Sequence, residues 1–272
     1  MGIIRRYRHI KYWPLRRGIQ ILSLAFFVYL LFYIGRVLPH DLYFRLDPLT
    51  GISAMLGERR WLPEFAWGLI VLALAVLGGR VWCGWLCPLG TLLDAVPARK
   101  NNTYKPEVPE AWRKVKYYLL TGTVLLVAVG GGALLILDPV TILYRTFTAF
   151  IPLERNVIAT ETGYTVFNIM SAVILAAILI LNAVRMRFWC RYLCPLGGLL
   201  GLVSKLAFRQ HWVKESVCQS CHRCMTYCPT GTIQQSRRYA SDPDECISCL
   251  ICKDVCPAKA AQFSRKPKLN AK

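Results

Sequence analysis

The chain has 272 residues, of which 55% are hydrophobic, yet its formal net charge is +19. This combination excludes an ordinary soluble protein, because long apolar runs must alternate with strongly basic segments. All 12 cysteines fall into C-x2-C or C-x3-C patterns, which are metal-ligand or redox spacings and do not suggest a secreted disulfide framework. The composition predicts a polytopic membrane protein whose cysteines lie in a reducing compartment.

Four apolar runs are long enough to cross a hydrocarbon core of about 30 Å. The first follows a basic tail and has no small-residue cleavage site, so we interpret it as an uncleaved helix and not as a signal peptide. No run contains a histidine that could be an axial ligand of a b-haem, and the sequence has no phosphate-binding glycine motif. We expect four transmembrane helices, at residues 18–35, 61–79, 117–137 and 162–184.

Lysine and arginine are distributed unevenly around these runs. Six lie in residues 1–17, seven in residues 80–116 and fifteen from residue 185 onward, whereas the connections 40–60 and 138–161 carry three and two. The positive-inside rule then places both termini and the middle segment in the cytoplasm, as in a multi-pass protein of a bacterial inner membrane. Contact with anionic membrane lipid accounts for most of the positive charge. Docking of an acidic redox partner is the alternative, and no nucleic acid is needed to explain it.

The membrane part contains an internal repeat. Leu46-Asp-Pro-Leu-Thr50 recurs as Leu137-Asp-Pro-Val-Thr141, and Trp82-Cys-Gly-Trp-Leu-Cys-Pro-Leu-Gly90 recurs as Trp189-Cys-Arg-Tyr-Leu-Cys-Pro-Leu-Gly197. Each half is therefore a helix, an outer Asp-Pro turn, a second helix and an inner Cys-x3-Cys-Pro motif. We expect an all-α membrane domain over residues 1–209, built from two parallel helix-pair repeats at about 18–97 and 112–204 that are related by an axis along the membrane normal.

This symmetry brings four cysteines to one cytoplasmic interface, namely Cys83, Cys87, Cys190 and Cys194. Cysteines four positions apart share a helical face, and the proline after the second one fits a helix break or a new helix start. Three interpretations stay open. The four thiols could hold a third iron–sulfur cluster with two ligands from each half, form two redox-active dithiols, or be reduced structural cysteines in an apolar interface.

Polar groups follow the first run at the opposite, outer interface. His40, Asp41, Tyr43 and Asp47 could bind the head of a lipid-soluble quinone, but each is more simply a solvated loop residue. The Asp-Pro-x-Thr sequences are likewise most simply turns, because Asp bonds to nearby backbone and Pro stops a helix. Since no electron carrier is visible inside the predicted runs, a quinone could carry electrons within the membrane.

Two copies of C-x2-C-x2-C-x3-C-P lie near the C-terminus. This spacing wraps thiolates around [4Fe-4S] clusters, and the fourth cysteine of each run binds the other cluster. Zinc, disulfides and c-type haem attachment at Cys218 to His222 are weaker alternatives, because the same cysteines complete the longer runs. We assign the first cluster to Cys218, Cys221, Cys224 and Cys256, and the second to Cys246, Cys249, Cys252 and Cys228.

The segment around these runs, residues 210–262, is expected to form a small α+β domain of the bacterial two-[4Fe-4S] ferredoxin type. So short a segment has little apolar core, and its clusters therefore supply part of its folding free energy. His222 and Leu250 stand where small residues usually let the backbone approach the cluster sulfurs. The last residues, 263–272, form a basic tail.

In the order and spacing of these motifs the chain resembles the NapH-type membrane polyferredoxins. The resemblance extends from residue 18 to residue 257 and includes the four apolar runs, the paired C-x3-C-P motifs and the double ferredoxin run. NapH-type proteins accompany periplasmic nitrate reductase as quinol dehydrogenase subunits, and related proteins serve nitrous oxide reductase and methylamine oxidation systems. The resemblance implies membrane-bound electron transfer between the quinone pool and the redox partner subunits of a larger complex, with the cysteines named above as the cofactor-binding positions.

Two functions are consistent with this sequence. The first is the electron-transfer subunit of a quinol dehydrogenase or quinone-reducing complex, with quinone or quinol as the exchangeable substrate. The second is a maturation or regulatory protein that delivers electrons or metal to another metalloenzyme, with the C-x3-C pairs acting as dithiols. A neighbouring gene for a terminal reductase would favour the first function, and a neighbouring assembly cluster the second.

Overall fold

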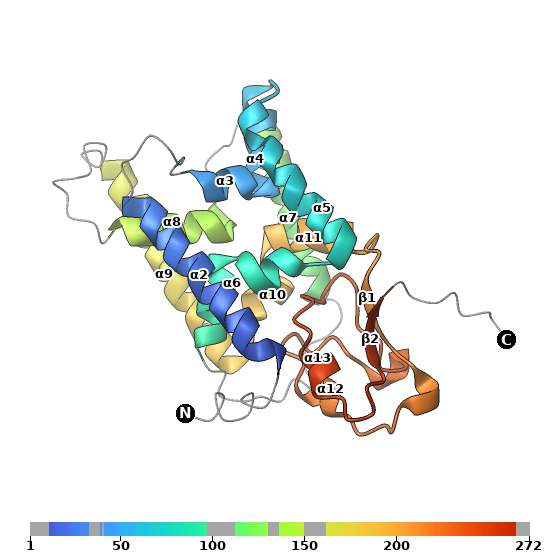
Figure 1. Cartoon of the computed structure of the whole chain (residues 1–272). Coiled ribbons are helices and arrows are strands. Elements are labelled where there is room, and N and C mark those ends of the chain that lie inside the picture. The colour runs from blue at the N-terminus through green and yellow to red at the C-terminus, as the bar shows by residue number, and fades with distance from the viewer. Residues whose placement is uncertain are drawn as a thin grey trace.

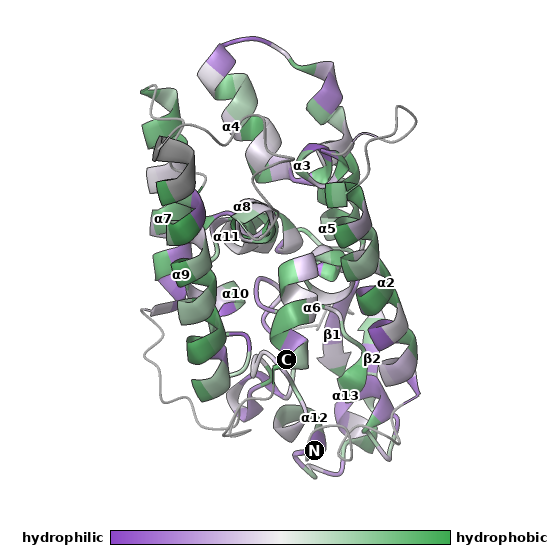
Figure 2. Cartoon of the chain, turned by 90° about the vertical axis from the view of Figure 1, so that its left-hand side faces the viewer, coloured by the Kyte–Doolittle hydropathy of each residue, from purple (hydrophilic) through white to green (hydrophobic). Residues whose placement is uncertain are grey.

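The computed structural model describes residues 11–32, 39, 41–96, 112–129, 136–149 and 162–264. Within these residues the chain is mostly helical, with one two-stranded sheet. In the view of Figure 2, the long helices stand on two sides of a group of short helices. The two strands lie together with α12 and α13 at one end of the molecule (Figure 1).

The long helices are α2 (Tyr12–Phe32), α7 (Trp112–Ala128), α9 (Thr162–Val184) and α5 (Gly68–Gly78), which continues the 3-10 turn η1 (Pro63–Trp67). The short helices of the membrane part are α3 (Leu42–Leu46), α4 (Pro48–Glu58), α6 (Pro88–Ala95), α8 (Pro139–Ala149), α10 (Phe188–Tyr192) and α11 (Pro195–Ser204). A π-helical turn, η2 (Trp82–Leu86), precedes α6. The C-terminal part holds β1 (Gln210–Val213), η5 (Glu215–Val217), α12 (Arg223–Thr226), η6 (Gln235–Arg237), α13 (Ile251–Asp254) and β2 (Ala261–Ser264).

Two of the expected spans are helices that are long and apolar enough to cross a membrane, α2 and the Val166–Val184 part of α9. The second expected span is a shorter apolar helix over Pro63–Gly78. The third begins at Trp112, earlier than the expected residue 117, and ends at Ala128; residues 130–135 of its expected course lie outside the described part. Hydrophobic residues predominate along these helices (Figure 2). The described residues therefore show a mostly helical protein with two candidate membrane helices.

The first helices of the two halves, α2 and α7, bury corresponding faces. The buried residues of α2 include Arg16, Gln20, Ser23 and Phe27, and those of α7 are Lys116, Leu120, Thr123 and Val127, each 100 positions after its counterpart. Both faces begin with a cation, carry a small hydroxyl side chain seven residues later, and then bury an apolar side chain. The cation at the start of each face has almost no exposed surface.

The Asp-Pro motifs begin helices. Asp47 caps α4 by accepting hydrogen bonds from the amides of Leu49 at 2.8 Å and Thr50 at 3.3 Å. Asp138 caps α8 through the amides at the same two offsets, both at 3.0 Å. The expectation that each aspartate bonds to nearby backbone is confirmed. As expected, helix α3 ends just before Asp47 and Pro48. Each proline also begins a new helix, because proline at the first helical position loses no hydrogen bond and has the φ that a helix needs.

Burial also corrects the interpretation of the outer polar residues. Asp47 has no exposed surface, and Tyr43 is buried with its hydroxyl 2.8 Å from that of Ser23. Both were expected to be solvated, but helix amides and a neighbouring hydroxyl take the place of water around them. Asp41 keeps about a third of its side chain exposed, and His40 lies outside the described residues.

The second cysteine of each C-x3-C motif stands immediately before a helix. Cys87 precedes α6 and Cys194 precedes α11, both of which begin with proline, so the expected new helix start is confirmed. The Cys87 amide donates to the Trp82 carbonyl and the Cys194 amide to the Trp189 carbonyl, both at 2.9 Å. Both bonds span five residues. The preceding turn is π-helical in the first half, whereas in the second half α10 stays α-helical and the Trp189 carbonyl also accepts from the Leu193 amide at 3.0 Å. Turns of the π-helical kind are frequent at functional sites.

The C-terminal part combines strands and short helices, and it shares a core with the helical part. Strands β1 and β2 pair antiparallel, with Gln210 opposite Ser264. A small core of its own includes Val213, Met225, Ile233, Tyr239 and Ala261. Residues of the second cysteine run, Ile247, Cys249 and Ile251, belong instead to the main core of the helical part. The second run therefore joins the two parts of the chain.

Removing either capping carboxylate is expected to destabilise the helical part. Asp47→Ala and Asp138→Ala each leave two buried amides without an acceptor, so we expect a loss of about 1–2 kcal/mol and a lower midpoint of thermal unfolding in detergent. Asp41→Ala is the matched control, because Asp41 precedes α3 without capping it through its side chain, and it should cost less than about 0.5 kcal/mol. Equal midpoints for all three variants would contradict the capping role.

Candidate functional site

The first predicted ligand set comes together around one small cavity. Cys218, Cys221, Cys224 and Cys256 all line it, beside Tyr239. Burial raises the pKa of the Cys224 thiol to about 11, and the other three thiols of the set act on it electrostatically. The fourth cysteine thus comes from the other run, which is the crossing that the spacing predicts.

The second predicted set is also assembled, at a deeper position. Burial raises the pKa of the Cys246 thiol to about 12, with Cys249 and Cys228 as neighbouring thiols. Burial likewise raises the pKa of Cys252, which has the same three cysteines around it. Cys228, Cys249 and Cys252 are buried, whereas Cys221 of the first set is exposed. The second set therefore faces the interior and the first set faces solvent.

The backbone of the two runs has the same unusual conformation. Ser220 and His222 have φ of 50° and 57°, and Ser248 and Leu250 have φ of 50° and 61°. Left-handed residues thus stand on both sides of the second cysteine in each run, a conformation that non-glycine residues seldom adopt. Such residues help to turn successive N–H groups toward one centre and create an anion-binding concavity. Four thiolates around an iron–sulfur core carry net negative charge, so these loops fit that group.

The ferredoxin-type thiol sets lack the arrangement of a site for a single metal ion. Among the described residues, no three His, Cys, Asp or Glu side chains converge on the position of one metal ion. A zinc site needs that convergence, whereas each thiolate of a cubane binds a different iron. A buried thiol with a raised pKa stays protonated by itself, and iron replaces that proton when it binds. The two crossed sets therefore fit [4Fe-4S] clusters better than mononuclear zinc.

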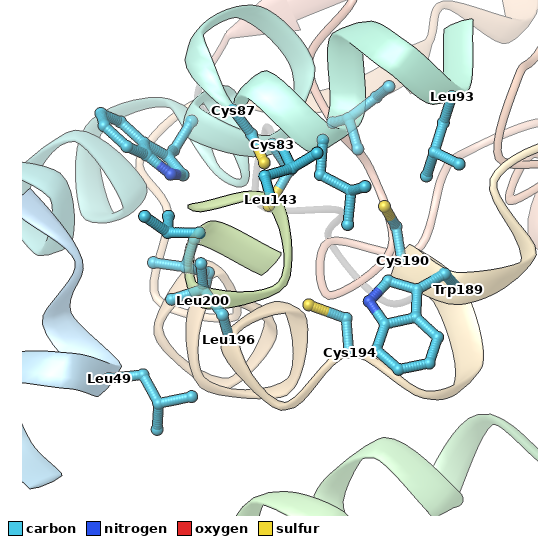
Figure 3. Close-up of a cluster of buried hydrophobic side chains, with 14 of the residues drawn as sticks. Leu49, Cys83, Cys87, Leu93, Leu143, Trp189, Cys190, Cys194, Leu196 and Leu200 are labelled. Atoms are coloured by element: carbon cyan, nitrogen blue, oxygen red, sulfur yellow. The ribbon is translucent and has the colours of Figure 1, made fainter. Parts of the chain in front are cut away.

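The four other cysteines meet in the main core. Cys83 lies on η2, Cys87 and Cys194 stand before α6 and α11, and Cys190 lies on α10; in Figure 3 their sulfur atoms point into a common space. All four are buried. Burial raises the pKa of Cys190 to about 11, although the Arg187 guanidinium opposes this rise. The structure thus brings together the C-x3-C motifs of both halves.

The second ferredoxin-type loop packs directly on this four-cysteine site. Gly84 lies inside the first C-x3-C motif, and a Cβ at this position would be 2.3 Å from the Ile247 carbonyl oxygen, so only glycine fits. Nearby, Trp85 donates its indole N–H to the Ser248 carbonyl at 3.1 Å. A residue between two thiols of the core site therefore touches a residue between two thiols of the second ferredoxin-type set.

Two buried arginines cross between the halves at the four-cysteine site. Arg80, three residues before Cys83, donates from Nη2 to the Cys190 carbonyl oxygen at 2.8 Å. Arg187, three residues before Cys190, donates from Nη1 to the Cys83 carbonyl oxygen at 2.8 Å. Both arginines are at most 1% exposed. These reciprocal bonds hold the two motifs face to face and place two guanidinium groups beside the four thiols.

Asp94 of α6 is the carboxylate partner of one crossing arginine. It accepts from Arg187 Nε at 2.8 Å and from Arg187 Nη2 at 2.7 Å, and it also pairs with Arg16 of α2. Burial alone would raise the pKa of Asp94, but the two guanidinium groups hold it well below its usual range. The carboxylate is therefore ionised, and the buried cations around it are paired as buried charges must be.

Glu245 is the carboxylate partner of the other crossing arginine, and it belongs to the ferredoxin-like part. Its Oε2 lies 3.7 Å from Arg80 Nη1, and its Oε1 pairs with Lys116 of α7. The preceding residue reinforces the contact, because Asp244 accepts from the Tyr117 hydroxyl at 2.7 Å. Residues 244–245 thus fasten the second cysteine run, which begins one residue later, to the helical part.

Sequence reasoning missed these buried ions. The sequence analysis attributed most of the positive charge to contact with lipid and did not single out Arg16, Arg80, Lys116 and Arg187. These four do not face lipid, because each is buried and paired inside the protein. The sequence does carry a signal for two of them. Both C-x3-C motifs are preceded by Arg-x-Trp, so the arginine repeats together with the cysteines.

Comparison with known proteins places iron–sulfur domains over both C-x3-C motifs and over the second ferredoxin-type run, whereas the first run, residues 218–228, lies between the matched segments. A family profile described as a 4Fe-4S binding domain matches residues 61–104 and 167–214, and another with that description matches residues 239–262. The chain is 28% identical to the methylamine utilization ferredoxin-type protein MauN of Methylorubrum extorquens, over 84% of this chain and 77% of that protein. It is 28% identical to the ferredoxin-type protein NapH of Haemophilus influenzae, over 81% and 75%. An uncharacterized protein of Methanocaldococcus jannaschii is 30% identical, over 72% and 76%. No solved structure matches the chain.

Adding a side chain at Gly84 should weaken the packing of the ferredoxin-like part on the helical part. Gly84→Ala forces its new methyl group into the Ile247 carbonyl, so the second loop must move away from the helical part. We expect limited proteolysis to cleave residues 210–264 faster in this variant than in the parent. Gly122→Ala is the control, because nothing lies within 4 Å of an added Cβ there and alanine is the better helix former. Equal cleavage rates in both variants would show that the contact does not hold the loop.

Proposed function

The chain belongs to the NapH-type membrane polyferredoxins, and on this premise we propose that it links the quinone/quinol pool to a redox partner. In this proposal the two crossed cysteine sets hold [4Fe-4S] clusters and the four core cysteines hold a third cluster. The observation that carries the proposal is the contact between Gly84 and Ile247, which brings a residue of the core site against a residue of the second ferredoxin-type set.

The arrangement gives the three sites an order. The four-cysteine site is in the helical core, the second set is buried against it, and the first set includes the exposed Cys221. Electrons from the membrane would reach the core site first, then the second set, and would leave for the partner from the first set. A partner subunit that accepts them would dock at the ferredoxin-like end, where Cys221 meets solvent.

The proposed membrane arrangement has four spans in two parallel helix-pair repeats. The shared buried faces of α2 and α7, the matching helix caps and the matching five-residue bonds of Cys87 and Cys194 support two related halves. The two matches of one iron–sulfur profile to corresponding segments support them as well. With the lysine and arginine distribution described above, both termini and all three cysteine sets lie on the cytoplasmic side of a bacterial inner membrane.

A third cluster accounts for the four core thiols better than dithiols or structural cysteines do. Each half contributes two thiols to one space, and guanidinium groups from both halves stand beside them. Structural cysteines need no cations near them, and a simple dithiol needs only one pair. Cations near thiols favour the thiolate form, which is the form that binds iron.

The electron balance of the proposed reaction is simple. A quinol that is converted to a quinone gives up two electrons and two protons, and each bound cluster supplies one-electron chemistry, so the two electrons leave one after the other. The chain's own residues bind the clusters, exclude water from the inner two and bring their ligands into contact. The two protons of the quinol would pass to water at the membrane surface, which completes the balance.

Iron analysis tests the number of clusters. Protein purified without oxygen should contain about twelve iron atoms and as much acid-labile sulfide per chain, because each cubane holds four of each. Cys83→Ala and Cys190→Ala should abolish the same EPR signal and leave the two ferredoxin-type signals in place. Cys221→Ser is the matched control, since it should change a ferredoxin-type signal and spare the core one. About eight iron atoms in the parent protein, unchanged in both alanine variants, would contradict the third cluster.

Reporter fusions test the membrane orientation. A reporter that is active only in the periplasm should give no signal when it is fused after Lys272, because the basic C-terminal part is expected in the cytoplasm. The same reporter inserted within residues 150–161 should be active. The opposite pair of results would invert the topology and place the ferredoxin-type cysteines outside the cytoplasm.

A further inference from the structure

The two carboxylates at the four-cysteine site occupy related environments in the two halves. Asp94 lies between Arg16 and Arg187, and Glu245 lies between Lys116 and Arg80. In each case one cation comes from the first helix of a half, α2 or α7, and the other is a crossing arginine. We call each carboxylate with its two cations a charge clamp. All six side chains of the two clamps are at most 3% exposed.

The cations of the two clamps correspond position by position. Arg16 and Lys116 begin the equivalent buried faces of α2 and α7. Arg80 and Arg187 stand three residues before the first cysteine of their motifs and bond to the carbonyl of the opposite motif. The cations of the two clamps are therefore arranged equivalently, although Arg187 donates two hydrogen bonds to Asp94 and Arg80 lies 3.7 Å from Glu245.

The carboxylates do not correspond in the sequence. Asp94 is six residues after the proline that starts α6, and the residue six after the proline of α11 is Gly201. A Cβ at Gly201 would lie 3.1 Å from the Asp244 carbonyl oxygen. The backbone that carries Glu245 therefore fills the space that a side chain at Gly201 would enter, and Glu245 supplies the carboxylate that the second half lacks.

The two clamps leave positive charge in excess beside the thiols. Within the clamps four cations face two carboxylates, which leaves two positive charges; outside them, the Asp244 carboxylate also acts electrostatically on Lys116. Another buried cation, Arg191, lies over the Tyr192 ring and belongs to neither clamp. The crossing arginines act electrostatically on the thiols, and Arg187 opposes the effect of burial on Cys190. Four thiolates around a [4Fe-4S] core carry a net negative charge that such a surplus offsets.

We propose that Glu245 completes the charge clamp of the second half in the place left by Gly201, so that docking of the ferredoxin-like part sets the reduction potential of the cluster between the halves. This inference rests on the third cluster of the proposed function. Glu245 touches neither the thiols nor an electron carrier, and it acts through Arg80 as a positioning residue. It also precedes Cys246, so the same contact fixes the second ferredoxin-type set against the core.

The test is an EPR-monitored redox titration of the signal that disappears in Cys83→Ala. Glu245→Gln and Asp94→Asn each remove one negative charge and should make reduction easier, raising the potential by about 59 mV or more, a tenfold change in the reduced-to-oxidised ratio for one electron. Arg80→Gln should lower the potential, and Arg80→Lys, which keeps the charge, should stay near the parent value. Glu215→Gln is the control, since this glutamate is exposed on the same part of the chain and should not move the potential.

The outcomes separate this inference from the function on which it rests. If the parent protein has no signal that depends on Cys83, the third cluster itself is wrong. If the signal is present but Glu245→Gln, Asp94→Asn and Arg80→Gln all titrate with the parent potential, the clamps do not set it and the inference is wrong. Loss of the signal in Glu245→Gln together with parent potentials in the Asp94 and Arg80 variants would also overturn it, because Glu245 would then be needed only for folding.

Discussion

The rest of the structure depends on the pairing of its buried cations. A guanidinium group without exposed surface is stable inside a protein only when carboxylate and carbonyl acceptors surround it, and removing one member of such a pair typically costs about 3–5 kcal/mol. Arg80 and Arg187 find their carbonyl acceptors in the opposite half, so neither half can close without the other. Among the described residues, the carboxylate paired with Arg80 belongs to the ferredoxin-like part. The pairing therefore couples both halves and the cysteine runs into one folding unit.

This coupling explains how a ferredoxin-like segment with a small core can be held firmly. The core of this segment contains few large apolar side chains. Its second cysteine run instead buries Ile247 and Ile251 in the core of the helical part. The glycine at position 84 allows that close approach. As a consequence, the deeper ferredoxin-type set lies against the four core cysteines, and the proposed electron transfer depends on this contact.

Much of the site was predictable because it depends on spacing alone. The crossed assignment of the eight ferredoxin-type cysteines and the convergence of the C-x3-C pairs follow from motif order, and the structure brings each predicted set together. The buried charges were not predictable in the same way, since a rule that treats lysine and arginine as interfacial cannot see partners distant in sequence. Asp47 was taken for a loop residue because its capping amides become visible only once α4 is known. Glu245 was missed because its counterpart, Asp94, lies in another part of the chain.

The most direct test of this account is an electron cryo-microscopy structure of the protein purified without oxygen in lipid. The account predicts cubane density bound by Cys83, Cys87, Cys190 and Cys194, with Arg80 and Arg187 crossing beside it and Glu245 paired to Arg80 and Lys116. Density for disulfides or for four unliganded thiols at that position, with the ferredoxin-type clusters present, would contradict it.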